Sequence, residues 1–422
     1  MADQLFFSRD TRVILEIVDP GSASNNDSWE IPVLDGFAFS QATNTSEITL
    51  NEFESSAEVS RRGRKMFNDS YAPAEWSFST YARPFKGALG NNTGESPAGL
   101  ADGRWDGDDG DRNHHAVEEA LWACFVDRDI HLARGARGAN DTDGTNSDWK
   151  TGSGTGTAST AVVNSTSNLE INFNSSNRSR LTEFNLYFVM GRGAYAAGTH
   201  TIYKVSNCAV NEATIDFDIE GIATISWSGN GKLITEIESA SNVSASGKFL
   251  HASTLITEGT AGNVVDNFIK NRLTTLAVTS SSPFQSSYDL VLTGGSITFS
   301  NNINYLTPET LGVVNQPLAH VTGTRNISGS ATCYLGSSSG AGTSADLFED
   351  LQEATTTITN SFGLTLKIGG ASAPNLTIAL PTCHLEIPTH SIEDVISLET
   401  NFHALPSTIG GTNEATLTYE GV

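Results

Sequence analysis

The pattern Phe-Ser-x-x-x-Asn occurs at Phe39–Asn44 and returns at Phe299–Asn304. Each occurrence is followed, in the same order, by a Ser/Thr-rich stretch ending in Tyr, a short helical pattern, an alternating stretch that begins with Phe and ends with Gly, and a segment ending in Cys. This repeated order indicates an internal duplication, which limits the fold to two copies of one unit. The alternative is that Ser/Thr-rich β sequences align with themselves by chance.

The matching segments predict the elements of each copy. Alternation of apolar and hydroxyl residues predicts strands, and apolar residues three or four apart predict a helix with one buried face. The connection before the helix is longer in the first copy, which therefore contains an insertion. The segments are Trp76–Tyr81, Ala116–Phe125, Phe184–Gly191, Asn207–Cys208 and Ile219–Ile225 in the first copy, and Gly329–Tyr334, Ser344–Glu353, Phe362–Gly369, Thr382–Cys383 and Ile392–Leu398 in the second.

The predicted fold class is mainly β, with two tandem β-sandwich or barrel domains that each carry one short flanking α-helix. Frequent Gly, Ser, Thr and Asn suit a β protein with many turns. We expect an N-terminal arm with strands over 1–34, a first domain over 35–235 with an inserted region at about 86–160, a connector over 236–273 and a second domain over 274–422.

Net charge argues against nucleic-acid binding, because phosphate contacts need Lys and Arg while this chain has a formal charge of −24 and a pI near 4.6. The same charge is compatible with a surface that repels DNA. No stretch has the length and apolarity of a membrane span. The N-terminus lacks the basic and apolar regions of a signal peptide, so we expect a protein made in a cytoplasm.

No catalytic, cofactor or metal motif is recognisable, so we expect no enzyme activity, no cofactor and no metal site. The four cysteines are scattered and are expected to be free and buried. Asp102–Asp111 faintly resembles a calcium loop but lacks the closing Glu. His114 and His115 are interpreted as the start of the helix, because they lack a carboxylate or cysteine partner at helical spacing.

Two long connections, Thr43–Ala74 and Asn302–Asn326, are candidate contact surfaces between subunits. Connections of this length are usually functional or disordered, and apolar residues in them argue against permanent disorder. The basic cluster Arg61–Lys65 also permits a nucleic-acid or nuclear-import interpretation, but in so acidic a chain an ion pair between subunits is favoured. The candidate contact residues are Glu52, Phe53, Arg61, Arg62, Arg64, Lys65, Met66, Phe67, Leu306 and Leu311.

Several segments resemble the tail tube proteins of long-tailed bacteriophages. They are Ser60–Ser70, Pro73–Tyr81, Ala116–Phe125, Tyr203–Cys208 and Phe217–Trp227. The resemblance covers most of the first copy and, more weakly, the second. It implies that each domain contributes strands to a barrel shared around a ring. Most such proteins have one domain per chain and six chains per ring, so a duplicated chain would complete a pseudo-sixfold ring as a trimer.

The resemblance also implies a function and partners. Rings stack head to tail into the tail tube, the conduit for DNA ejection, and genomic DNA passes without specific binding. The two long connections, Thr43–Ala74 and Asn302–Asn326, are then expected to make the ring-to-ring contacts. The partners implied are other copies of the chain and further tail proteins, namely the tape measure, the tail terminator and the baseplate or tip, with no membrane. The location implied is the virion tail, assembled in the host bacterial cytoplasm. A lumen lined with carboxylates and hydroxyls would repel phosphate.

Two other functions remain open. A β-rich adhesin or carbohydrate-binding module would use exposed aromatic residues such as Trp105, Trp149 and Tyr195. This alternative explains the composition but not the duplicated order of strands and helix. Another phage tail component, such as a sheath or baseplate protein, is the second alternative.

Overall fold

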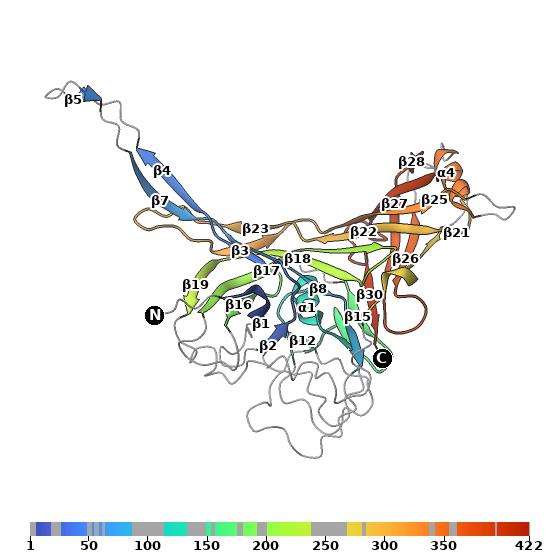
Figure 1. Ribbon diagram of the computed structural model, residues 1–422, viewed down its shortest axis with the longest axis horizontal. Helices are drawn as coiled ribbons and strands as arrows, with labels where there is room; N and C mark the ends of the chain where they lie inside the picture. The colour runs from blue at the N-terminus through green and yellow to red at the C-terminus, as the bar shows by residue number, and fades with distance from the viewer. Residues whose placement is uncertain are drawn as a thin grey trace, which may run out of the picture.

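A computed structural model describes residues 6–17, 27–48, 53–54, 59–60, 64–86, 114–132, 149–152, 157–174, 180–191, 201–237, 268–280, 284–336, 342–353, 361–392 and 395–421. The protein is mainly β, as the sequence predicts (Figure 1). Two α-helices of the described residues accompany the strands, α1 (Glu119–Val126) and α4 (Ser344–Glu353).

The first half of the chain contains β1 (Thr11–Ile17), β2 (Asp27–Ile31), β3 (Ala38–Ser40), β4 (Thr43–Ile48), β5 (Phe53–Glu54), β6 (Val59–Ser60), β7 (Lys65–Tyr71), β8 (Ala74–Tyr81), β9 (Pro84–Lys86), β10 (His114–Ala116), β11 (Ile130–Leu132), β12 (Trp149–Thr151), β13 (Thr157–Ala158), β14 (Val162–Asn164), β15 (Leu169–Asn172), β16 (Phe184–Met190), β17 (Thr201–Asp218), β18 (Thr224–Gly231) and β19 (Leu233–Ile237).

The second half contains β20 (Thr275–Thr279), β21 (Ser287–Asp289), β22 (Leu292–Ser300), β23 (Ile303–Leu306), β24 (Ala319–Thr322), β25 (Asn326–Tyr334), β26 (Phe362–Ile368), β27 (Asn375–Leu385), β28 (Thr389–Ser391), β29 (Ser397–Ala404) and β30 (Thr416–Glu420). Short 3₁₀ turns lie at Ser8–Asp10 and Asn271–Leu273.

The two halves use the same order of antiparallel strand pairing. It runs β2–β1–β16–β17–β18–β8–β3 in the first half and β21–β20–β26–β27–β29–β25–β22 in the second. A hairpin follows β3, formed by β4 and β7, and another follows β22, formed by β23 and β24. Corresponding elements can therefore be matched between the halves.

The register of one strand pair agrees in detail. Phe184 faces Cys208 and Phe362 faces Cys383, and in both pairs the register shifts at the residue after Phe. A β-bulge at the same place bends the strand locally in both halves. All four cysteines are free and buried, as predicted.

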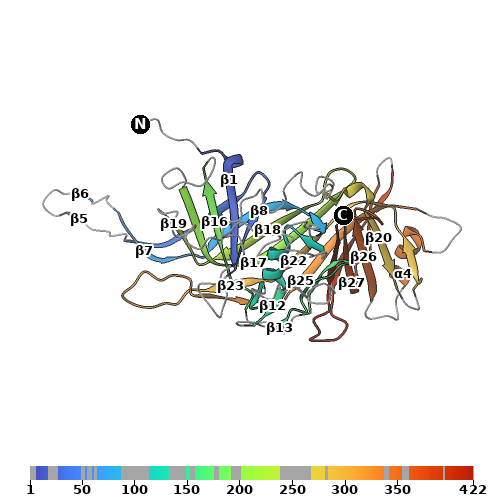
Figure 2. The ribbon, with the colours of Figure 1, turned by 90° about the horizontal axis from the view of Figure 1, so that it is seen from below.

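One continuous sheet joins the halves, in the order β3–β8–β18–β17–β22–β25–β29. The junction is the pair β17–β22, which runs from Glu212 opposite Ser300 to Asp218 opposite Gly294. A second junction pairs β15 with the last strand, β30. Figure 2 shows the strands of the second half continuing beside those of the first.

Large aromatic residues fill the core beneath the joined sheet. Trp122 of α1 contacts Trp227 of β18 and Phe299 of β22, with ring centroids 4.7 and 5.5 Å apart. Every residue of α1 is buried, so the prediction of a helix with one buried face is wrong for the first half. The strands of the inserted region, β10 to β13, contribute to this burial, because His115 of β10 and Trp149 of β12 contact Glu119 of α1. In α4 only Ser344, Leu347 and Leu351 are buried, as an amphipathic helix requires.

The structure decides three element boundaries, and the prediction for His114 and His115 is wrong. β17 ends at Asp218 and Gly221, at φ +99°, turns the chain into β18, so Ala213–Trp227 contains parts of two strands. His114 and His115 lie in a strand rather than at the start of the helix. Asn271 begins a short 3₁₀ turn before β20.

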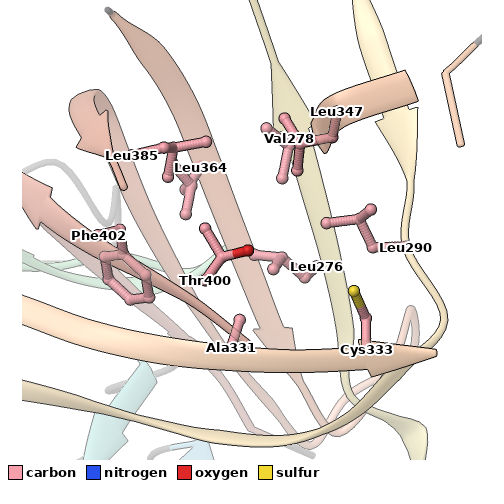
Figure 3. Close-up of a pocket in the computed structure, with 10 residues that line it drawn as sticks. All are labelled: Leu276, Val278, Leu290, Ala331, Cys333, Leu347, Leu364, Leu385, Thr400 and Phe402. Atoms are coloured by element: carbon pink, nitrogen blue, oxygen red, sulfur yellow. The ribbon is translucent and has the colours of Figure 1, made fainter. Parts of the chain in front are cut away.

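Thr400 lines a small apolar cavity in the second half, with Leu276, Leu347, Leu364 and Phe402 among its neighbours (Figure 3). Strand pairing places Thr400 opposite Ala331, at the position where the first half has Trp227 opposite Phe78. The second core therefore has less side-chain volume at this point than the first, and it presents a hydroxyl to an apolar space.

We expect Thr400→Val to raise the free energy of unfolding by about 0.5–1 kcal/mol, because it removes a hydroxyl from an apolar site and keeps the side-chain volume. Urea denaturation of the purified protein measures the change. Thr332→Val, on the opposite face of the sheet, is the matched control and should be close to neutral. An equal gain in both variants would show that β-propensity, not the cavity, is responsible.

Candidate functional site

The joined sheet has one buried face and one open polar face. On the open face, directly opposed residues form a row across six strands, namely Ser79, Ser226, Thr214, Thr298, Ser328 and His403. Hydroxyl oxygens 3.1 Å apart join Ser79 to Ser226 and Thr214 to Thr298. The neighbouring row is apolar apart from Thr80 and faces the core, with Ile225, Ile215, Ile297, Gly329 and Phe402 following it.

Charge on the open face is of one sign. Its acids are Glu75, Glu212, Asp216, Asp218 and Glu399. The strands of the joined sheet contain no Lys or Arg, if β17 is counted from Ala209 onward. Hydroxyls and carboxylates on such a face give a negative potential and no cation to hold a phosphate.

Two strands at the ends of this sheet have an unpaired edge among the described residues. β3 pairs only with β8, and β28 pairs only with β29. An unpaired edge exposes a row of backbone donors and acceptors and invites another strand. The sheet is therefore open at both ends for pairing with other chains.

The β23–β24 hairpin lies across the first half (Figure 1). The Tyr305 hydroxyl donates to the backbone oxygens of Asn207 and Asn230. His320 is fully buried, and its Nε2 accepts a hydrogen bond of 2.9 Å from the backbone N–H of Leu181. The ring proton therefore lies on Nδ1, 3.3 Å from a carboxylate oxygen of Glu183. Burial raises the pKa of Glu183, but bonds from His320 and Asn207 outweigh it and hold the pKa below its ordinary value.

The β4–β7 hairpin is exposed over most of its length. Ile48, Met66 and Phe67 have exposed fractions of 40, 60 and 51%. It contacts the loop of the other hairpin, because the N–H of Tyr71 donates to the Asn315 oxygen at 2.9 Å. Otherwise it projects away from the sheet (Figure 1).

The structure places the predicted contact residues on these two hairpins. Lys65, Met66 and Phe67 are exposed in β7, and Leu306 and Leu311 are exposed in and beyond β23. Both connections form antiparallel hairpins, a regularity not predicted from their composition.

Arg64 pairs with Glu47 across the β4–β7 hairpin at 3.2 Å, so this cation has a partner in its own chain. Phe53 lies in β5, and nothing is described of its side chain. Glu52, Arg61 and Arg62 lie outside the described residues.

A buried polar cluster beneath α1 was not predicted from the sequence. Glu119 accepts from the backbone N–H of Ala116 at 3.1 Å, from Asn164 at 2.7 Å and from Trp149, and it lies 3.2 Å from His115. Its neighbour Glu118 accepts from the Arg83 N–H at 3.3 Å. The premise that His115 lacks a carboxylate partner at helical spacing is wrong, because Glu119 follows it by four residues. Asn164 and Trp149 lie far from Glu119 in sequence, so no local motif indicates the whole cluster.

This cluster has a structural role. Tyr419 of β30 accepts a bond of 2.7 Å from Trp122 and donates to Glu118, which ties the last strand to the helix. Glu118, Glu119 and Trp149 are fully buried, which closes the cluster to any substrate. The expectation that Trp149 is exposed is wrong, and Trp105 and Tyr195 lie outside the described residues. Among described residues no group of His, Cys, Asp and Glu is arranged to hold a metal ion.

Comparison with known proteins finds a tail tube protein. The chain is 29% identical over 412 residues to tail tube protein pb6 of Escherichia phage T5, an alignment that covers 97% of this chain and 74% of that protein. The chain is thus similar to a phage tail tube protein over nearly its whole length. No family model matches.

The similarity supports a structural role in a tail tube. It also agrees with the resemblance of individual segments in the sequence. No helix in the described part of the chain is both long and apolar enough to span a membrane.

Burial raises the pKa of Glu118 from its ordinary 4.5 to about 7. The unfolded chain loses this proton near pH 4.5 while the folded protein keeps it, so the stability contributed by neutral Glu118 falls as pH rises from 4.5 to 7. We expect Glu118→Gln to change stability little at pH 5 and to raise it by roughly 1–3 kcal/mol at pH 8. Urea denaturation at the two pH values measures this.

Glu75→Gln on the open face is the control for removing one negative charge. It should change stability equally at pH 5 and pH 8. If Glu118→Gln behaves in the same way, the buried carboxyl is already ionised in the folded protein and the pKa argument is wrong.

Proposed function

We propose that the chain forms stacked rings of a phage tail tube, through which DNA leaves the particle during ejection. The observation that carries this is the joined sheet with a polar, acidic face and an unpaired edge at each end. Its similarity to a tail tube protein supports the same role. Sheets that pair edge to edge around a ring form a closed barrel without free edges.

The junction inside the chain is a template for the junction between chains. Strand matching makes β3 the counterpart of β22, and β28 the counterpart of the C-terminal part of β17. Because β17 pairs with β22 in one chain, β28 of one copy pairs with β3 of the next. Thr214 faces Thr298 within the chain, and the corresponding residues, Thr389 and Ala38, face each other between chains.

Three copies close the ring. Each chain supplies two corresponding units, residues 35–235 and 274–422, so three chains supply six and give pseudo-sixfold symmetry. A ring of this kind turns the open polar face inward. Ring-on-ring contacts are heterologous and do not close, so they produce a filament.

The inward face keeps DNA mobile. Carboxylates at Glu75, Asp216 and Glu399 repel phosphate, and the absence of Lys and Arg from the strands of the joined sheet removes the groups that bind it. DNA therefore passes without specific binding. The remaining partners are other tail proteins, namely the tape measure, the tail terminator and the baseplate or tip. The assembled protein belongs to the virion tail and assembles in the host cytoplasm.

Cysteine cross-linking tests the ring and its stoichiometry. Ala38→Cys combined with Thr389→Cys should form disulfides between copies, because directly opposed residues of antiparallel strands have Cβ atoms about 4.5–5.5 Å apart. Non-reducing gel electrophoresis should show a ladder that ends at the covalent trimer. Thr214→Cys with Thr298→Cys is the matched control, and it should form the same bond within one chain.

A ladder of cross-linked products that continues to six chains would support a closed ring but contradict a ring of three chains. Rings seen by electron microscopy without any cross-link would contradict the β3–β28 pairing. The four native cysteines are buried, and each single-cysteine variant measures their background.

Charge reversal tests the inward face. We expect Glu75→Lys, Asp216→Lys and Glu399→Lys together to slow DNA ejection at least tenfold, because each new cation binds phosphate. Tube length should not change. The rate of DNA release from variant particles measures the effect, and the corresponding Gln and Asn variants control for loss of charge. Unchanged release at low salt would contradict repulsion as the mechanism.

A further inference from the structure

The β4–β7 hairpin lacks the support that a two-stranded ribbon needs. Residues 43–48 and 64–69 are all exposed, and they include Ile48, Met66 and Phe67. Isolated hairpins are marginally stable in water unless another surface covers one side. The part of the chain that the structure describes supplies only the contact of Asp69 and Tyr71 with Asn315. A further surface must therefore come from elsewhere.

The corresponding hairpin, β23–β24, is covered. It continues directly from β22, and because β22 pairs with β17, the hairpin is carried across the first half. There Tyr305 reaches the backbone of Asn207 and Asn230, and the Ile303 N–H donates to the Asn211 side chain at 2.8 Å. On β24, the second strand of the hairpin, His320 is buried against Leu181 and Glu183. The β23–β24 hairpin therefore packs on the first half because it continues from β22, which is paired with β17.

The second half has a surface that corresponds to the one beneath the β23–β24 hairpin, and no hairpin covers it among the described residues. Strand matching equates Asn207, Asn211 and Asn230 with Thr382, Glu386 and His403. Glu386 and His403 lie 3.5 Å apart with side chains 49 and 46% exposed. Two apolar side chains beside them are also exposed, Ile387 at 56% and Leu405 at 43%.

The two uncovered surfaces are complementary. The hairpin presents Lys65 beside the apolar side chains of Met66 and Phe67, and the second half presents Glu386 beside Ile387 and Leu405. Burying the apolar side chains is favourable by roughly 25 cal/mol per Å². Opposite charges at the rim align the surfaces more than they add affinity.

We propose that the β4–β7 hairpin of one copy docks across the second half of the neighbouring copy in the same ring. This rests on the proposed pairing of β3 with β28. Since β4 continues from β3 as β23 continues from β22, that pairing carries the hairpin over Thr382, Glu386 and His403 of the neighbour. Thr45, the counterpart of Tyr305, then lies near His403.

A short bismaleimide tests the contact. Thr45→Cys with His403→Cys should cross-link between copies in isolated single rings, separated from stacked tubes by gel filtration. Tyr305→Cys with Asn230→Cys is the matched control, because it places the linker across the same contact inside one chain. Each single-cysteine variant should remain at the monomer position on a denaturing gel.

Three outcomes are distinguishable. Cross-linked dimers and trimers from single rings support the proposal. Cross-links that form only in stacked tubes overturn it, because the hairpin then bridges rings instead of neighbours within one ring. Rings that form in electron micrographs without any such cross-link overturn it while leaving the tube function intact, whereas the absence of rings contradicts the proposed function itself.

A second measurement does not depend on cysteine placement. Met66→Ser with Phe67→Ser should weaken ring formation, raising the protein concentration at which rings appear at least tenfold, while the monomer keeps its Tm because these side chains contact no core. Ile409→Ser, on the exposed turn between β29 and β30, is the control and should leave ring formation unchanged. Equal effects of both variants would overturn the proposal.

Discussion

The backbone pairing of β17 with β22 determines the arrangement of everything else in the structure. It makes one sheet from two halves, brings the open polar residues of both halves onto the same face, and carries the β23–β24 hairpin across the first half. It also places Phe299 of β22 against Trp122, so that the core of the first half is completed by a strand of the second.

The same junction explains why the two halves differ in their cores. The first half surrounds α1 with the insertion strands, β15 and the last strand β30, so the helix is buried on every side and carries Trp and Phe. The second half leaves α4 on the surface, and the helix is amphipathic. Its core has Thr400 where the first has Trp227. Corresponding strands of the two halves thus pack around cores of different volume, because different elements surround the helix in each half.

A buried cluster of acidic residues lies at the start of the enclosed helix α1. Glu118 and Glu119 satisfy the backbone at the start of α1 and connect it to Asn164 and to Tyr419 of the last strand. Burial makes ionisation of Glu118 costly, and the hydrogen bonds from Arg83 and Tyr419 only partly offset that cost. The cluster locks the end of the chain to its first half, where β30 already pairs with β15.

Much of this was predictable because it depends on local periodicity. The alternation in Trp76–Tyr81 and Phe362–Gly369 indicates strands, and the repeated Phe-Ser-x-x-x-Asn pattern by itself indicates related units. The resemblance to tail tube proteins depends on the same local segments, and it is confirmed. The exposed positions of Met66, Phe67 and Leu311 also follow from long polar connections with isolated apolar residues.

Long-range pairing decided the rest. Alternation does not distinguish one long strand from two joined by a turn, so it does not reveal the turn at Gly221. Helical spacing does not reveal what covers the outer face of α1, and isolated histidines, acids and Trp149 do not reveal that they meet in one buried cluster. Sequence by itself determined which residues form strands and that the chain repeats, because those properties depend on neighbours in the chain. Which strands are adjacent, which face is open and which edges are unpaired depend on hydrogen bonds between distant residues, and only the tertiary structure decides them.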